Sequence, residues 1–562
     1  MKRQVLVVAI SMFCLQGYAQ QAAVKQIPKS WHMLDYQTDG IYGTSVEKAY
    51  RTILRDKKPK QTIIVAVIDS GVDTTHEDLK PVLWHNPGEI PGNGKDDDGN
   101  GYVDDVYGWN FLGGKDGRNV TKDSYEAARV YYRYKKKYSQ ITSDSLLSPQ
   151  EAWEWKNYRR AKVQIESQAK EASMYVLFLK SIVEKLPAMD SVLQKSMSKN
   201  LYTGDDLLRF KATTVEESKA RNTVLGLFQQ LEQMDKYNKQ MIDDLMTFYD
   251  GEKSKVDAAE KGPEDYRGLI VQDNYSDIND RYYGNNDVMA GSPMHGTLVS
   301  GIIAASRSND IGVKGIADNV RIMAIRTVPE GDEHDKDIAN AIRYAVDNGA
   351  RVINMSFGKS FSPDKQWIDD AARYAESKGV LLVQAAGNSS ANVDQQDVFP
   401  NPNPLDGKSK PLTNWITVGA SGALKSELAA SFSNYGKTKV DVFAPGVDIY
   451  STLPGGNIYG SESGTSFASP IVAGLAALLM SYYPELSVKQ VKYVIEKSVT
   501  PMNGTKVTKP GAETQIEFTE LSATGGLINV YDAIRLASTL KGEKNEQEKV
   551  LPQPKLKKTP KG

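Results

Sequence analysis

The chain has 562 residues, which allows two to four domains and exceeds what a small disulfide-stapled domain needs. It carries 69 basic and 70 acidic residues, and this near-neutral balance offers no positive excess that would indicate a nucleic-acid partner. Its single cysteine, Cys14, excludes disulfides and leaves the chain beyond it without a cysteine nucleophile.

The N-terminus has the pattern of a secretory signal peptide. Lys2 and Arg3 precede an apolar stretch over residues 5–15, and Gly17 and Ala19 place small residues at the −3 and −1 positions of a cleavage site. A membrane anchor or a core strand is the alternative, but the stretch is too short to span a bilayer. We therefore expect cleavage after Ala19 and a secreted or periplasmic mature protein without a transmembrane segment.

Strand and helix patterns alternate over much of the remaining chain. Strands are expected at 62–68, 320–327, 351–356, 380–385 and 416–419. The first is β-branched on both faces, as in a strand covered by helices on both sides. Amphipathic helices are expected between the strands, including 335–348 and 364–378. This alternation predicts a three-layer α/β/α domain with a mostly parallel sheet, whose functional groups gather at the carboxyl ends of the strands.

An acidic loop follows the first strand. Oxygen ligands at positions 1, 3, 5, 7 and 9 of a calcium loop are matched by Asp96, Asp98, Asn100, Tyr102 (through its carbonyl) and Asp104. Gly101 stands at the sharp turn, but Tyr107 replaces the terminal glutamate, so the loop is not a complete EF-hand. A solvated acidic turn is the alternative. We expect a structural calcium ion because so many carboxylates repel one another without a cation.

Residues 113–262 are rich in Lys, Glu and Gln and are predicted to be helical. A heptad seam, ended by Pro187, runs through Ile165, Ala169, Ala172, Val176, Leu179, Val183 and Leu186. A second apolar stripe runs through Val224, Phe228, Leu231, Met234, Tyr237, Met241, Leu245 and Phe248. With a break at 200–205, these stripes predict a hairpin of two long helices, the first over 148–186. It either packs only on itself or forms an arm that binds a protein partner or controls substrate access.

Four short strings hold the groups needed for nucleophilic acyl transfer. They are Val67-Ile68-Asp69-Ser70-Gly71, Met294-His295-Gly296-Thr297, Ala386-Gly387-Asn388 and Gly464-Thr465-Ser466-Phe467-Ala468-Ser469-Pro470. A serine hydroxyl is a weak nucleophile until an imidazole takes its proton, and a carboxylate must orient that imidazole. Ser466, His295 and Asp69 are the candidates for these roles. Asp73 is a second candidate for the carboxylate, but its position is more typical of a turn cap. The other histidines, His32, His76, His85 and His334, lie in none of these strings and are expected to be structural.

The strings, in this order, resemble the signatures of the subtilisin-like serine proteases, peptidase family S8. The resemblance covers about residues 61–111 and 264–537. It implies that Asn388 is the amide of the oxyanion hole. It also implies that two segments clasp the peptide and line the first specificity pocket. These are Ser356-Phe357-Gly358 and Ala385-Ala386-Gly387. Since neither contains a charged residue, apolar or aromatic side chains are the expected preference.

Two features depart from the family pattern. The helical insertion separates Asp69 from His295, which leaves the triad credible because the cost of loop closure rises slowly with length. Leu298 stands where relatives usually carry a second histidine, which is not the catalytic one.

These patterns predict a secreted serine endopeptidase that acts on peptides or proteins through an Asp–His–Ser triad and an acyl-enzyme. A catalytically silent peptide-binding protein of the same fold and an esterase with the same triad are the alternatives. The expected organisation is a signal peptide over 1–19, an N-terminal segment over 20–60, a catalytic domain over 61–112 and 263–540, a helical insertion over 113–262, and a disordered tail over 541–562 that is rich in Lys, Glu and Pro. The N-terminal segment gives no clear signal of an inhibitory propeptide.

Overall fold

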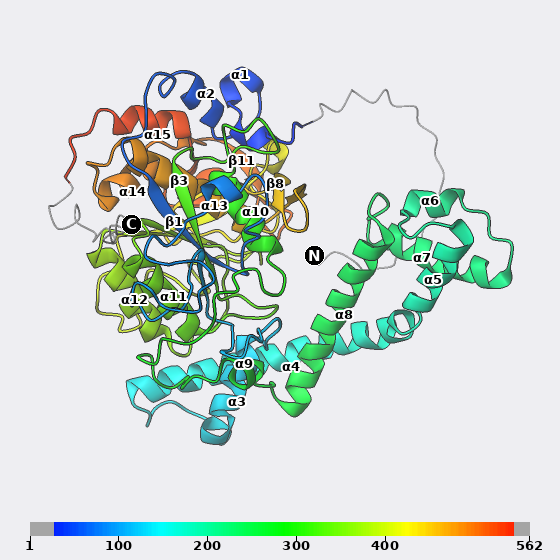
Figure 1. The fold of residues 1–562 in the computed structure, drawn as a ribbon. Helices are drawn as coiled ribbons and strands as arrows, with labels where there is room; N and C mark the ends of the chain where they lie inside the picture. The colour runs from blue at the N-terminus through cyan, green and yellow to red at the C-terminus, as the bar shows by residue number, and fades with distance from the viewer. Residues whose placement is uncertain (1–26, 544–562) are drawn as a thin grey trace. The chain divides into compact units, whose positions relative to one another are not determined.

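The computed structural model describes residues 27–543 (Figure 1). The predicted signal peptide with its cleavage site at Ala19, and the predicted tail from residue 544 onward, lie outside the described residues. The described chain forms two compact units, one made of residues 27–126 and 264–543 and the other of residues 127–263. Residues 113–126, which the sequence analysis assigned to the insertion, belong to the first unit, where Val120 lies in the core.

A nine-stranded sheet forms the centre of the first unit, with the strand order β10-β13-β7-β6-β5-β4-β1-β3-β2. The strands are β1 (Ile63–Asp69), β2 (Gly108–Asn110), β3 (Val320–Arg326), β4 (Val352–Met355), β5 (Leu381–Ala385), β6 (Trp415–Ser421), β7 (Val442–Pro445), β10 (Thr500–Pro501) and β13 (Gly526–Leu527). All neighbouring pairs are parallel except β10 with β13. The five predicted strands are all present, each within two residues of the expected ends.

Helices cover both faces of this sheet (Figure 1). One face packs against α10 (Met294–Ala304) and α13 (Thr465–Tyr482), and the other packs against α11 (Asp335–Asp347) and α12 (Lys365–Ser377). Side chains alternate between the two cores along each strand: Val65 and Val67 of β1 face the first pair of helices, and Ala66 and Ile68 face the second. The predicted three-layer α/β/α fold is confirmed.

Smaller elements complete the first unit. They are α1 (Tyr36–Asp39), α2 (Val46–Arg51), α9 (Tyr266–Val271), α14 (Val488–Lys497), α15 (Val530–Ala537), the hairpin of β8 (Ile449–Leu453) and β9 (Ile458–Glu462), the hairpin of β11 (Lys506–Thr508) and β12 (Gln515–Glu517), and four single-turn 3₁₀ helices. Trp31, Met33, Val46 and Leu54 are buried in the same core as α13. The segment 27–60 is therefore packed as part of this unit.

One described helix, α13, is long and apolar enough to cross a membrane. It is buried almost throughout and packs against four parallel strands, β4 to β7. The apolar run over residues 471–480 is thus part of a buried core helix.

The second unit is helical, as predicted, but it contains more helices than the predicted hairpin. Its helices are α3 (Glu126–Tyr138), α4 (Pro149–Val183), α5 (Leu186–Met197), α6 (Gly204–Arg209), α7 (Val215–Gln230) and α8 (Asn238–Lys261). The expected single helix over 148–186 ends at Val183. Pro187 then stands in the first turn of α5, where its missing N–H costs nothing. The second stripe is likewise divided between α7 and α8, so the prediction of two uninterrupted helices is wrong.

The heptad seam nevertheless lies where the pattern placed it. Ile165, Ala172, Leu179 and Val183 are buried on α4, which packs along α8. Tyr175 of α4 contacts Phe248 of α8 edge to face. The apolar stripes of this unit thus form its own core.

Candidate active site

Asp69 and His295 are joined by a hydrogen bond although they lie 226 residues apart in the chain. Asp69 is the buried last residue of β1, and His295 lies in the first turn of α10. His295 Nδ1 is 2.8 Å from Asp69 Oδ1, which also accepts a hydrogen bond from the Ser70 N–H at 2.7 Å. Glycine at 296 permits this approach, because a Cβ there would overlap the carbonyl oxygen of Gly71.

The electrostatics of His295 favour its protonated form. Burial disfavours the charged imidazole, but the charge and hydrogen bond of Asp69, together with the negative charge of Glu462, outweigh that cost. The net effect raises the pKa of His295 above its ordinary value. An imidazolium formed when this histidine accepts a proton is therefore stabilised.

Ser466 lies in the first turn of α13, where backbone N–H groups have no partner within the helix. Its hydroxyl donates to the carbonyl oxygen of Ser356 at 2.9 Å, and Ser356 Oγ donates to the carbonyl oxygen of Ser466 at 2.7 Å. For Ser466 to act as a nucleophile with His295 as its base, the hydroxyl would have to turn from Ser356 toward His295. Such rearrangement is common, because catalytic hydrogen bonds often align only when substrate is bound.

Asn388 is oriented by the residue that precedes the candidate nucleophile. Asn388 Oδ1 accepts hydrogen bonds from both the N–H and the hydroxyl of Thr465, at 2.9 and 2.8 Å. Thr465 Oγ1 in turn accepts the N–H of Gly387 at 3.0 Å. Because these bonds fix the Oδ1 of Asn388, its amide Nδ2 can act as a donor at the N-terminal end of α13, the helix that carries Ser466.

The two expected peptide-binding segments follow neighbouring parallel strands. Ser356-Phe357-Gly358 comes directly after β4, and Ala385-Ala386-Gly387 includes the end of β5 and the residues after it. The first segment is anchored by Lys359, whose backbone exchanges two hydrogen bonds with Phe399. The buried ammonium of Lys359 pairs with Glu126 at 2.6 Å and with Asp335 at 2.7 Å. Burial and these ion pairs hold the segment in place.

A cavity of about 270 Å³ adjoins the candidate triad. Its lining includes Asp69, His295, Ser356, Phe357, Arg326 and Glu330. A smaller one of about 30 Å³ is lined by Ala385 and Ala386 together with Asp397 and Lys439, which form an ion pair at 2.9 Å. The two expected peptide-binding segments themselves contain no charged residue. The charged residues that line these cavities come from other parts of the chain.

A model of the Subtilase family, Peptidase S8, matches residues 60–514. The chain belongs to the subtilase family. It is 42% identical to the thermophilic serine proteinase of Bacillus sp. strain AK1 over 38% of this chain and 48% of that protein. It is 41% identical to subtilisin DY of Bacillus licheniformis over 37% of this chain and 70% of that protein, and 34% identical to thermitase of Thermoactinomyces vulgaris over 42% and 80%. Subtilases are serine-type endopeptidases, and these matches put the chain among them.

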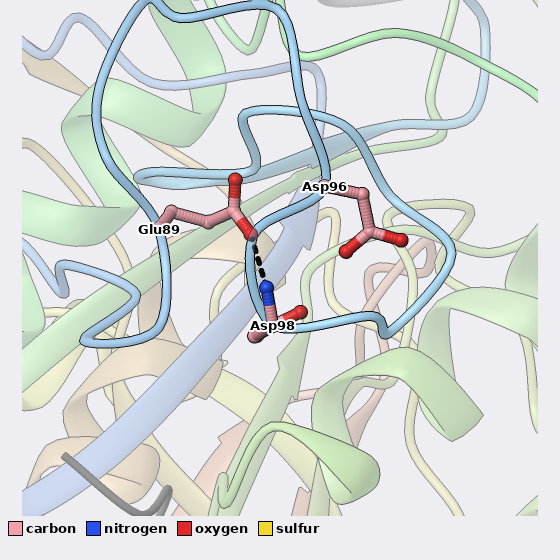
Figure 2. A group of neighbouring side chains, drawn as sticks. All are labelled: Glu89, Asp96 and Asp98. Atoms are coloured by element: carbon pink, nitrogen blue, oxygen red, sulfur yellow. Dashed lines mark hydrogen bonds between the residues drawn. The ribbon is translucent and has the colours of Figure 1, made fainter. Parts of the chain in front are cut away.

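In this subtilase the acidic loop brings Asp96 and Asp98 together with Glu89, a residue that the sequence analysis missed (Figure 2). One carboxylate oxygen from each of the three lies within 4.8 Å of the others. Glu89 Oε1 also accepts the N–H of Asp98 at 3.2 Å. Burial and the neighbouring negative charges of Asp98 and Asp97 raise the pKa of Glu89. A divalent cation would relieve this repulsion.

Of the other expected ligands, Asp104 lies apart from this group and Asn100 lies next to it. Asp104 turns its carboxylate toward the N–H groups of Gly92, Asn93 and Gly94, and is not grouped with Asp96 and Asp98. Asn100 donates its N–H to Asp96 Oδ1 at 3.1 Å and its Nδ2 to Asp98 Oδ2 at 3.3 Å, while its Oδ1 accepts the N–H of Tyr102. The alternating pattern thus identified two members of the cluster. Glu89 lies outside the alternating positions, so that pattern gave no signal for it.

The remaining histidines and Asp73 make contacts typical of structural residues. His76 Nε2 is 3.1 Å from the carbonyl oxygen of Ile458, and His334 Nε2 is 2.9 Å from Asp123. Burial lowers the pKa of His32 to about 4. His85 packs against the ring of Tyr107. Asp73 accepts backbone hydrogen bonds from Thr75 and Gly455, in keeping with a turn cap.

Proposed function

We propose that this chain cuts internal bonds of peptide and protein substrates through an acyl-enzyme formed on Ser466. The observation that carries the proposal is the 2.8 Å contact between Asp69 and His295, two residues far apart in the chain. Membership of the subtilase family and the oriented amide of Asn388 support the same assignment.

In the first half of the reaction, His295 takes the proton of the Ser466 hydroxyl as its oxygen attacks the carbonyl carbon of the substrate. Asp69 holds the Nδ1–H tautomer, so that Nε2 accepts this proton, and stabilises the imidazolium. His295 then gives the proton to the leaving amine. The peptide C–N bond breaks, and the acyl group stays on Ser466.

In the second half, His295 takes a proton from water while the water oxygen attacks the acyl carbon. The proton returns to Ser466 as the acid product leaves, so the enzyme is regenerated. Both halves pass through a tetrahedral oxyanion. Asn388 Nδ2 and the Ser466 N–H are the proposed donors to it, and such donors act most strongly where charge develops.

The proposed peptide clasp consists of Ser356, Phe357 and Gly358 on one side and Ala385, Ala386 and Gly387 on the other. Extended substrate segments can add to such edges by backbone hydrogen bonding. The apolar character of both segments supports a preference for apolar or aromatic side chains.

We also propose a structural cation, calcium by the oxygen chemistry of the donors, bound by Glu89, Asp96 and Asp98. The carboxylate group fits a hard divalent ion, since its oxygens converge within 4.8 Å. Of the five ligands expected from the spacing, Asp96 and Asp98 have the best support. The ion would stabilise the loop and takes no part in the chemistry.

The N-terminal pattern supports export, with cleavage after Ala19 and a secreted or periplasmic destination. The helical unit over 127–263 holds none of the proposed catalytic residues. We propose that it controls access or binds a protein partner.

The test of the proposed function is Ser466→Ala. This variant should fold, lose at least a thousandfold of its activity on a chromogenic peptide, and lose labelling by a serine-directed phosphonate. Ser377→Ala, which changes an exposed serine at the end of α12, is the matched control and should keep full activity. Undiminished cleavage by Ser466→Ala would rule out the proposed nucleophile. Peptide binding without cleavage by the unmodified chain would favour a silent binding protein, and cleavage of esters alone would favour an esterase.

A further inference from the structure

Asn434 is a buried residue between β6 and β7 whose side chain contacts one loop three times. It is 2% exposed. Its Oδ1 accepts the N–H groups of Ser389 and Ala391 at 3.0 and 2.8 Å, and its Nδ2 donates to the carbonyl oxygen of Ala386 at 2.8 Å. All three partners belong to the loop 386–391, which carries Asn388.

The orientation of this amide is determined by its partners. Backbone N–H groups only donate and carbonyl oxygens only accept, so the reversed amide would face donor to donor and acceptor to acceptor. The backbone N–H of Asn434 makes a fourth contact, to the carbonyl oxygen of Gly387 at 2.8 Å. Gly387 has φ +102°, and a Cβ there would lie 2.5 Å from Asn434 Nδ2. The loop and this side chain therefore fit together only when residue 387 is glycine.

We propose that Asn434 is a positioning residue for the oxyanion amide. Its four hydrogen bonds reach residues 386, 387, 389 and 391, on both sides of Asn388. Thr465 orients the Asn388 side chain, and Asn434 holds the backbone from which that side chain projects. The inference rests on the proposed function and deepens it.

The physical reason is the tolerance of an oxyanion hole. A donor acts when it lies about 2.7–3.1 Å from the developing charge. A misplacement of about 1 Å can cost roughly a hundredfold in rate. Loss of Asn434 would leave two N–H groups and one carbonyl of the loop without their buried partner, and the loop would move to find others.

The experiment compares Asn434→Ala, Asn388→Ala and the double variant of the full chain on a short chromogenic peptide. Asn388→Ala should lower kcat about 10²–10³-fold, as expected for an oxyanion donor. Asn434→Ala should lower kcat at least tenfold, with KM changed less than threefold. The double variant should be no more than about threefold slower than Asn388→Ala. Affinity for a peptide boronic acid should fall in parallel with kcat/KM across the three variants.

Asn414→Ala is the matched control, because Asn414 is equally buried and its Nδ2 donates to the backbone carbonyl of Val380 at 2.8 Å. It should lower the melting temperature and leave kcat within twofold. If Asn434→Ala does not fold, Asn434→Ser replaces it, since the hydroxyl keeps one hydrogen bond to the loop.

Three results would overturn the positioning role while Asn388→Ala still loses its kcat. They are an unchanged kcat in a folded Asn434 variant, a rise in KM alone, and losses of kcat that multiply in the double variant. If Asn388→Ala itself keeps its kcat, the proposed oxyanion role falls, and the inference falls with it. These two failures are distinguished by the Asn388 variant alone.

Discussion

The charge environment of His295 is the residue-scale feature that decides when the proposed base works. Two carboxylates raise the pKa of this imidazole: Asp69, which contacts it, and Glu462, which acts through its charge. Glu462 ends β9, four residues before Ser466. Only Asp69 could be assigned from a catalytic string, since nothing in the sequence marks the exposed Glu462 as a neighbour of the histidine.

From this raised pKa we predict how kcat/KM depends on pH. His295 must be neutral to accept a proton, so kcat/KM should rise with pH through a midpoint above the ordinary histidine value of about 6.5. Glu462→Gln removes one source of the raised pKa and should move this midpoint to lower pH, with little change in the high-pH plateau. The pH profile of kcat/KM for a short neutral peptide measures both effects.

Glu513→Gln, which changes another exposed glutamate, is the control and should leave the midpoint in place. A midpoint near pH 4 would point to a carboxylate base. A midpoint unmoved by Glu462→Gln would show that this charge does not reach His295.

At the scale of elements, the loop from Glu89 to Asp104 uses its acidic residues in two ways. Asp104 caps a turn through three backbone N–H groups and lies outside the group of converging carboxylates. Glu89, Asp96 and Asp98 instead converge on one another (Figure 2). Asp96 and Glu89 also accept three backbone N–H groups each. They differ from Asp104 in that their carboxylates converge with that of Asp98, and this convergence is the reason we propose a cation there.

We therefore predict that calcium raises the melting temperature and that a chelator lowers it, because an ion that binds only the folded chain stabilises it by mass action. At a calcium concentration of about a hundred times the dissociation constant, the gain is about 2.7 kcal/mol. The double variant Asp96→Asn/Asp98→Asn should lose this response. Thermal unfolding followed by circular dichroism, with and without calcium, is the measurement.

Asp97→Asn is the control, since Asp97 lies between the two yet is outside the converging group, and its variant should still respond to calcium. A melting temperature indifferent to both calcium and chelator would identify the loop as an acidic turn.

For the whole molecule, the main question is what the helical unit over residues 127–263 contributes. It has its own apolar core, which includes Leu179, Leu193, Phe228 and Leu245. The first and last helices of this unit lie next to each other near its two ends, since the hydroxyl of Tyr132 donates to the carbonyl oxygen of Ala259 at 3.2 Å. Because the unit has its own core and its two ends are near each other, it can be replaced by a short linker.

Excision of 127–263, with Glu126 and Glu264 joined by a Gly/Ser linker, should leave cleavage of a short peptide within tenfold, or about 1.4 kcal/mol in the barrier. Cleavage of folded proteins should change much more, upward if the unit restricts access and downward if it recruits substrate. The ratio of kcat/KM on a folded protein and on a short peptide measures this. A folded excision variant that fails on short peptides would make the helical unit part of the catalytic framework.

The sequence by itself determined the features that depend on local pattern. β-Branched runs and 3.6-residue periodicity predicted the strands and helices of the α/β unit, because burial on a strand or helix repeats with the period of the backbone. The strings around Asp69, His295, Asn388 and Ser466 identified the candidate triad and amide, since each string is a short contiguous pattern. The helical pattern of the insertion was also recognised, but not its breaks, because Pro187 permits a new helix to begin as readily as it ends one.

Only the tertiary structure decided which distant residues meet. Asn434 holds the loop of Asn388, and Lys359 pairs with Glu126, with no trace of these pairings in the local sequence. They form because the parallel strands bring their carboxyl ends to one edge of the sheet, and because buried polar groups there must find partners. Which polar groups pair is determined by their proximity in the folded chain, and their separation along the sequence does not predict it.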